Sequence, residues 1–251
     1  MPALRCGSKI IECEGVIFDK DGTLIDSFKI WPDLIKARVK ILQREIGFDN
    51  EMARLLEKTM GLNEGGIIRR SPIVVGSREQ TAAAMATMLF VYRGIPWDAG
   101  MEKVNRAFDL CDQEMGLACQ AQPFPGAQQT LKNLFEAGFK LAVATNDDME
   151  RTYALMEYAG LAPYLHAYAC RNEVERAKPA PDLIYLVCRR LGLDAGQCIM
   201  VGDSPLDIQM GMNAGVYMNV RVLGRALCKE EITGSNVITI NYITNIIPFL
   251  L

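Results

Sequence analysis

The chain has 251 residues, of which 50% are hydrophobic and 23% are charged. This length favours one core domain with a smaller companion domain, and the composition is typical of a globular protein rather than a disordered one. The formal net charge of −3 argues against a protein that follows a nucleic-acid backbone, because that function requires a basic surface. We therefore expect no nucleic-acid partner, and nothing in the sequence indicates an oligomeric state.

Targeting segments and metal-binding cysteine motifs are not apparent. The eight cysteines are scattered and form no C-x-x-C pair, which predicts reduced thiols in the core rather than a zinc site or a disulfide framework. The segment Met1–Lys9 lacks the apolar region of a signal peptide, and no apolar run approaches the roughly 20 residues of a membrane-spanning helix. We expect a cytoplasmic protein without a membrane partner.

Short apolar runs that end in a polar residue, followed by helical periodicity, recur along the chain. This pattern is typical of β-α units on a parallel sheet. The first predicted strand is Gly15–Asp19, and the later ones cover residues 140–145, 166–170, 198–203, 216–220 and 237–240. Helices are predicted near residues 126–137, 148–159, 181–191 and 205–213.

The interval between the first two predicted strands has a different pattern. Its apolar residues recur at helical spacing, with Leu34, Val39, Ile41 and Leu42 as examples, and strand-like runs are almost absent. We predict an α/β protein whose parallel-sheet core domain consists of residues 1–27 and 119–251. An all-helical cap domain, residues 28–118, is inserted into this core.

Polar side chains follow several of the predicted core strands. Asp19 ends the first strand, Thr145 the second and Asp203 a later one, while Lys178 precedes a predicted helix. Because the carboxyl ends of parallel strands meet at one edge of a sheet, these groups are expected to converge there. Asp21 is two residues from Asp19, so in an extended segment both would project to the same side.

Three or four converging carboxylates, including Asp207, would repel one another unless a cation lay among them. A hard divalent ion with oxygen ligands meets this need, and Mg²⁺ suits it best. Lys178 can place an ammonium against a phosphate, and Thr145 offers a hydroxyl donor. Asn146 begins a predicted helix whose free N–H groups favour an anion. Phosphoryl transfer is therefore the leading chemistry.

Simpler interpretations exist for each residue alone. Asp21 and Gly22 form a common turn dipeptide, Lys178 precedes a proline and fits an exposed loop, and Asp207 fits a helix cap. The joint order of these residues favours the phosphate site over the separate alternatives.

The segment Asp19–Thr23, the pair Thr145-Asn146, Lys178-Pro179 and Gly202-Asp203 followed by Asp207 resemble the four motifs of the haloacid dehalogenase-like hydrolase superfamily. The helical insertion after the first motif is similar to the cap of its phosphoglycolate phosphatase and β-phosphoglucomutase branch. The resemblance implies a Rossmann-like core under a mobile lid.

The resemblance also implies roles for the motif residues. Asp19 would be the nucleophile, and Asp21 the general acid and base. Thr145, Asn146 and Lys178 would bind the phosphate, with Lys178 also screening the nucleophile. The Mg²⁺ ligands would be Asp19, Asp21, Asp203 and Asp207.

The function implied is Mg²⁺-dependent hydrolysis of a small phosphorylated metabolite, of the phosphoglycolate or sugar-phosphate type, through an aspartyl phosphate. Dehalogenating members lack the second aspartate of the first motif, so Asp21 argues against halide chemistry. A phosphomutase similar to β-phosphoglucomutase is an alternative that the core motifs hardly distinguish. A non-catalytic phospho-accepting receiver or interaction domain is a second one, although receivers are about half this length and have no lid.

Substrate specificity is expected to come from the cap. Asn63 and Glu64, in a glycine-rich loop, are candidates for contacts with the leaving group. Arg69 and Arg70 are candidates for binding a carboxylate or a second phosphate, with an exposed helix face as the simpler interpretation.

Overall fold

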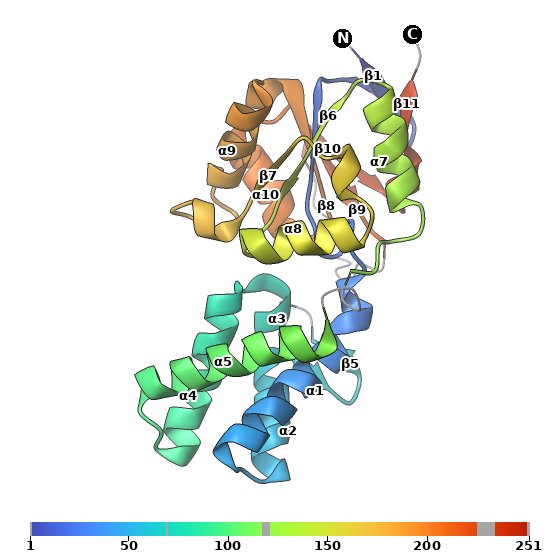
Figure 1. Ribbon diagram of the computed structural model, residues 1–251. Helices are drawn as coiled ribbons and strands as arrows, with labels where there is room; N and C mark the ends of the chain where they lie inside the picture. The colour runs from blue at the N-terminus through green and yellow to red at the C-terminus, as the bar shows by residue number, and fades with distance from the viewer. Residues whose placement is uncertain (1, 69, 117–120, 225–233, 250–251) are drawn as a thin grey trace. The chain divides into compact units, whose positions relative to one another are not determined.

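The computed structural model in Figure 1 describes residues 2–68, 70–116, 121–224 and 234–249. The chain forms two compact units. The core unit consists of Met1–Asp26 and Ala121–Leu251, and the cap unit consists of Ser27–Gln120.

The core unit is built on a six-stranded parallel sheet in the order β10-β9-β8-β3-β6-β7. Its strands are β3 (Gly15–Phe18), β6 (Lys140–Ala144), β7 (Ala167–Ala169), β8 (Cys198–Gly202), β9 (Met218–Val222) and β10 (Val237–Ile240). Every residue of β3 and of β8 is buried, as expected of central strands covered on both faces. The predicted α/β fold with a parallel sheet is confirmed.

Helices cover both faces of this sheet (Figure 1). They are α7 (Ala127–Glu136), α8 (Met149–Tyr158), α9 (Asp182–Leu191) and α10 (Pro205–Ala214). Helices α9 and α10 pack against each other and against β6–β9, whereas α7 packs on β6 and on the strand β11 (Ile246–Phe249). Right-handed crossovers between parallel strands account for this division of the helices between the two faces.

A small antiparallel sheet in the core unit was not expected from the sequence. Strands β1 (Ala3–Cys6) and β2 (Lys9–Glu12) pair with each other, and β11 adds to the other edge of β1. Each strand has only four residues, and the third comes from the opposite end of the chain. The apolar pattern of any one segment therefore does not reveal the sheet.

The cap unit is a set of helices around its own apolar core. The helices are α1 (Ser27–Ile46), α2 (Asn50–Met60), α3 (Pro72–Val75), α4 (Arg78–Arg93) and α5 (Trp97–Met115). Leu34, Val39, Ile41 and Leu42 are all buried in this core. Among the described residues, the unit departs from an all-helical one in a single two-stranded ladder, β4 (Leu62–Asn63) with β5 (Gly66–Ile67).

The described cysteines are free and buried: Cys6, Cys13, Cys111, Cys170, Cys188 and Cys198. Within the same part of the chain, no helix has both the length and the apolar character needed to cross a bilayer.

Candidate active site

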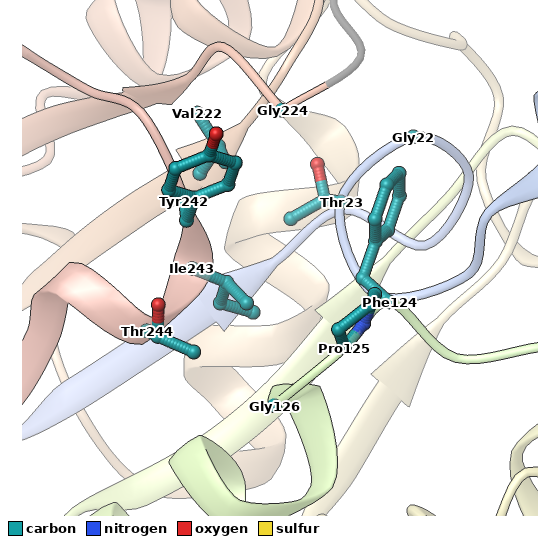
Figure 2. A pocket seen from close by; sticks show the side chains of 10 residues that line it. All are labelled: Gly22, Thr23, Phe124, Pro125, Gly126, Val222, Gly224, Tyr242, Ile243 and Thr244. Carbon is teal, nitrogen blue, oxygen red and sulfur yellow. The ribbon is translucent and has the colours of Figure 1, made fainter.

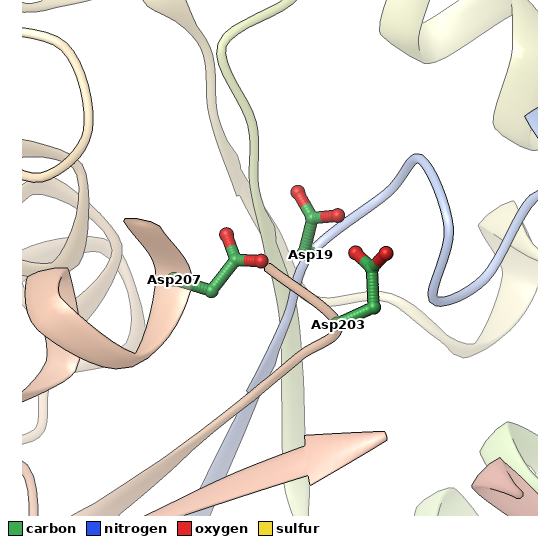
Figure 3. A group of neighbouring side chains, drawn as sticks. All are labelled: Asp19, Asp203 and Asp207. Atoms are coloured by element: carbon green, nitrogen blue, oxygen red, sulfur yellow. The ribbon is translucent and has the colours of Figure 1, made fainter. Parts of the chain in front are cut away.

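Three carboxylates converge beyond the ends of the central strands (Figure 3). Asp19 directly follows β3, Asp203 directly follows β8, and Asp207 lies in the first turn of α10. Ligand oxygens from the three side chains all lie within 4.8 Å of one another. Asp19 and Asp207 are buried, and Asp203 is partly exposed. The parallel sheet thus brings together three of the residues that the sequence suggested.

A buried lysine bridges two of these carboxylates. The Lys178 Nζ atom lies 2.5 Å from Asp19 Oδ1 and 2.7 Å from Asp207 Oδ1. The backbone N–H of Lys178 donates to Asn146 Oδ1 at 3.1 Å, which joins the loop before α9 to the residues that follow β6. Asn213 of α10 donates from Nδ2 to the carbonyl of Pro179 at 2.8 Å. Hydrogen bonds with Asn146 and with Asn213 thus fix the backbone that carries the Lys178 side chain.

Burial and the neighbouring charges shift the pKa values of Asp19, Asp203 and Lys178. Burial and the charge of Asp207 raise the pKa of Asp19 to about 7, although Lys178 lowers it. Burial, with Asp207 and Asp19, also raises the pKa of Asp203 well above its usual range. Burial alone would lower the pKa of Lys178, but Asp19 and Asp207 outweigh it and raise that pKa. Three carboxylates facing one ammonium leave an excess of negative charge that a metal ion can balance.

Asp207 has a structural role as well. Its Oδ2 atom accepts hydrogen bonds from the backbone N–H of Ser204 at 3.0 Å and from the Ser204 hydroxyl at 2.6 Å. In return, Ser204 Oγ accepts from the Asp207 N–H at 3.3 Å, which completes a capping box at the start of α10. The cap interpretation and the site interpretation of Asp207 therefore both apply, one to each carboxylate oxygen.

Asp21 has a different set of partners from Asp19. The chain turns after β3, where the N–H groups of Leu24 and Ile25 both donate to the carbonyl of Lys20 at 2.9 Å. This turn ends the strand alternation, so Asp21 is not part of the acidic group of Asp19, Asp203 and Asp207. Its Oδ2 atom instead lies 2.7 Å from the ammonium of Lys20.

The residues suggested for phosphate binding surround the end of β6. Thr145 is buried, and its Oγ1 atom accepts from the N–H of Asp147 at 3.2 Å. Because β6 pairs with β3 in parallel register, Thr145 and Asp19 continue neighbouring strands. The helix that follows, α8, has Asp148 as its N-cap residue. Asn146, which follows Thr145, is thus hydrogen-bonded to Lys178, and Lys178 contacts the acidic group.

The loop after β3 and the connection from β8 to α10 approach each other closely, and this approach requires glycine at positions 22 and 202. Gly22 has a φ of +85°, and a Cβ atom there would lie 2.5 Å from Asp203 Oδ2. A Cβ atom on Gly202 would lie 2.4 Å from the Cβ of Asp207. Both positions leave room for the carboxylates to converge.

Comparison with known proteins agrees with this arrangement. The sequence profile of the family described as haloacid dehalogenase-like hydrolase matches residues 13–215, which include all the candidate residues of the core unit. The chain belongs to this hydrolase family.

Individual relatives extend over most of the hydrolase. It is 32% identical over 204 residues to "Probable phosphatase IndB" of Dickeya dadantii, covering 80% of this chain and 77% of the relative. It is 25% identical over 206 residues to a phosphoglycolate phosphatase of Cupriavidus necator, and the alignment covers 82% of this chain and 79% of the relative. Among solved structures, a predicted phosphoglycolate phosphatase of Haemophilus somnus aligns with a TM-score of 0.63 at 20% identity, covering 84% and 86% of the two chains.

The core unit of the hydrolase has a cavity of about 610 Å³, and Gly22 and Thr23 of the loop after β3 form one of its walls (Figure 2). No charged side chain is among its described lining residues: Gly22, Thr23, Phe124, Pro125, Gly126, Val222, Gly224, Tyr242, Ile243 and Thr244. An uncharged cavity does not bind a phosphate by ion pairing, so this cavity is not a candidate for the phosphate subsite.

The cap candidates lie in the cap unit. Asn63 is at the ladder turn, and its Oδ1 atom accepts from the N–H of Gly65 at 2.9 Å. Glu64 is exposed in the same turn. Arg70 is exposed with a φ of 57°, and Arg69 lies outside the described residues. Their suggested contacts with substrate stay predictions.

We expect Gly202→Ala to destabilise the hydrolase by about 1–3 kcal/mol, because the added methyl group overlaps Asp207 at the start of α10. Gly196→Ala is the matched control, since a Cβ atom there meets nothing within 4 Å among the described residues. Its effect should stay within about 0.5 kcal/mol. Urea unfolding of the two variants measures the difference, and equal midpoints would contradict the packing argument.

Proposed function

We propose that this hydrolase is a magnesium-dependent phosphatase of small phosphorylated metabolites that forms a phosphoenzyme on Asp19. The observation that carries the proposal is the buried Asp19 carboxylate, bridged by Lys178 to a second aspartate and close to a third. Relatives named as phosphatases, over about four fifths of the chain, support this choice of chemistry. The free buried cysteines suit a reducing compartment such as the cytoplasm.

The donor set fits Mg²⁺. Carboxylate oxygens from separate chain segments lie within 4.8 Å of one another, and hard oxygen ligands are those that Mg²⁺ prefers. Both carboxylate oxygens of Asp207 already accept hydrogen bonds, one from Lys178 and one from Ser204, so we assign the metal contacts to Asp19, Asp203 and the backbone carbonyl of Asp21. When bound, Mg²⁺ supplies positive charge to the phosphate oxygens.

In the first half of the reaction, Asp19 is the nucleophile. Lys178 holds the Oδ1 atom, so Oδ2 attacks phosphorus, and the bond from phosphorus to the ester oxygen breaks. A protonated Asp21 gives its proton to the departing oxygen, and the alcohol leaves. Lys178 and the Thr145 hydroxyl donate to the phosphoryl oxygens as charge shifts onto them.

In the second half, water attacks the phosphorus of the aspartyl phosphate. The Asp21 carboxylate takes a proton from that water, and the bond between phosphorus and Asp19 Oδ2 breaks. Inorganic phosphate leaves, Asp19 is restored as a carboxylate, and Asp21 is again protonated. One residue thus acts as acid in the first step and as base in the second.

The substrate class is tested with a panel of phosphoglycolate and sugar phosphates, together with 4-nitrophenyl phosphate. We expect Mg²⁺-dependent release of inorganic phosphate, abolished by EDTA, without isomerised sugar phosphate. Isomerisation without net phosphate release would favour the mutase alternative. The absence of any turnover with Mg²⁺ would contradict phosphatase activity.

Asp19→Asn should lower phosphate release by more than about 10³-fold, because the amide is a poor nucleophile in a site whose parts act together. Asp194→Asn is the matched control: Asp194 precedes β8 at the other end of the sheet, and asparagine caps equally well. Circular dichroism of both variants should match that of the unmodified protein. Turnover by Asp19→Asn at the unmodified rate would exclude Asp19 as the nucleophile.

The raised pKa of Asp19 predicts how pH affects the metal-free protein. In the folded state the carboxyl keeps its proton up to a pH of about 7, whereas its ordinary pKa is 3.8. Between these values the folded state binds more protons than the unfolded chain, so stability falls as pH rises through this window. At low pH, Asp19 would have to lose that proton before it could hold Mg²⁺, whereas at high pH it would not.

We therefore expect Mg²⁺ to raise the unfolding temperature more at pH values above about 7 than at pH values well below it. Thermal unfolding with EDTA or with excess MgCl₂, at one pH on each side of this value, measures the effect. Asp194→Asn again serves as the control and should keep the pH dependence. A Mg²⁺-induced shift of equal size at both pH values would contradict metal binding at Asp19.

A further inference from the structure

Lys20, between the two aspartates of the first motif, is buried rather than exposed to solvent. Its side chain is 1% exposed, and the ammonium lies 2.7 Å from Asp21 Oδ2 and 2.9 Å from Asp147 Oδ2. Burial alone lowers the pKa of Lys20, but Asp147 and Asp21 outweigh it and raise that pKa, so the group carries its charge. A charged lysine inside the protein is therefore held between two carboxylates.

Asp147 fixes the position of this ammonium. Its Oδ1 atom accepts from the backbone N–H of Asp148 at 2.9 Å, and Arg151 Nε lies 3.3 Å from its Oδ2 atom. Burial opposes the charge of Asp147, but Lys20 and Arg151 outweigh it and lower its pKa to about 2. The start of α8 thus holds the carboxylate that holds Lys20.

We propose that Lys20 is a positioning residue that orients the Asp21 carboxylate for proton transfer. The inference rests on the proposed function, in which Asp21 is the general acid and base. Asp21 is 31% exposed on its side chain, so its own surroundings confine it less than those of Asp19, which is 9% exposed. The contact with Lys20 links Asp21 Oδ2 to Asp147, which precedes α8.

A purely structural ion pair is the competing explanation. A buried charge loses its hydration, and apolar residues of similar volume often replace buried ion pairs without loss of stability. Fold stability alone therefore does not require an ion pair here, although removal of the lysine by itself leaves two carboxylates without their counter-charge. Proton transfer does require a fixed carboxylate, because a misplacement of about 1 Å can reduce turnover by roughly 100-fold.

The test compares two leaving groups in Lys20→Met, which fills the space without a charge. An alkoxide needs a proton in order to leave, whereas 4-nitrophenolate leaves without one. We expect kcat/KM to fall by about 100-fold for the alkyl phosphate that the unmodified protein hydrolyses fastest, and by less than about tenfold for 4-nitrophenyl phosphate. The Mg²⁺-induced shift in unfolding temperature should be kept, because Lys20 contacts Asp21 and Asp147 rather than the acidic group.

Lys140→Met is the matched control. Lys140 begins β6 in the same sheet, and its Nζ atom donates to the carbonyl of Leu191 at 2.7 Å, away from both aspartate groups. Its ratio of alkyl to aryl kcat/KM should equal that of the unmodified protein. An equal fall for both substrates in Lys20→Met, or no fall for either, would overturn the positioning role.

Lys20→Gln keeps two N–H donors and serves if Lys20→Met does not fold. Its alkyl-to-aryl ratio of kcat/KM should fall below that of the unmodified protein, and a ratio equal to the unmodified value would overturn the inference. The two proposals fail differently. No hydrolysis by the unmodified protein overturns the phosphatase and Lys20 together, whereas an unchanged ratio in an active Lys20 variant overturns Lys20 alone.

Discussion

The repulsion among carboxylates at one edge of a parallel sheet is the constraint on which this site depends. Asp19 follows β3, and Asp203 and Asp207 lie in the connection from β8 to α10, so the pairing of β3 with β8 brings the three carboxylates together. Lys178 supplies one positive charge, and burial raises the pKa of both Asp19 and Asp203. The fold keeps this imbalance of charge, which a metal ion can balance.

Two buried lysines each pair with one aspartate of the first motif and with one aspartate from another segment. Lys178 bridges Asp19 to Asp207 in the first turn of α10, and Lys20 bridges Asp21 to Asp147 beside the start of α8. Each lysine thus connects one motif carboxylate to the beginning of a helix. Asp19 and Asp21 are only two residues apart, yet they have separate counter-charges. Separate surroundings are what two carboxylates need if one is to attack phosphorus while the other transfers protons.

The sequence predicts the residues of this site better than their contacts. The apolar run of β3 and the polar residue after it locate Asp19, because a buried parallel strand must end near solvent. Lys20 gives no such signal, since a lysine beside an Asp-Gly turn is usually exposed. Its burial depends on Asp147, which lies more than a hundred residues later. The dual role of Asp207 is equally hidden, because capping and ion pairing use different oxygens of one carboxylate.

Sharing each lysine between two aspartates also makes the site respond unequally to the loss of charge. Removal of one aspartate leaves its lysine paired with the other, as Lys178 would stay paired with Asp207 without Asp19. Removal of a lysine leaves two carboxylates facing each other, and an uncompensated buried charge costs about 3–5 kcal/mol. Asp19 and Asp21, the proposed nucleophile and proton donor, can therefore each be replaced by asparagine with little effect on the fold. Replacement of Lys20 or Lys178 destabilises the fold, and a less stable protein loses activity toward every substrate. A change in the ratio between alkyl and aryl substrates therefore distinguishes a positioning role of Lys20 from a structural one, whereas a change in total activity does not.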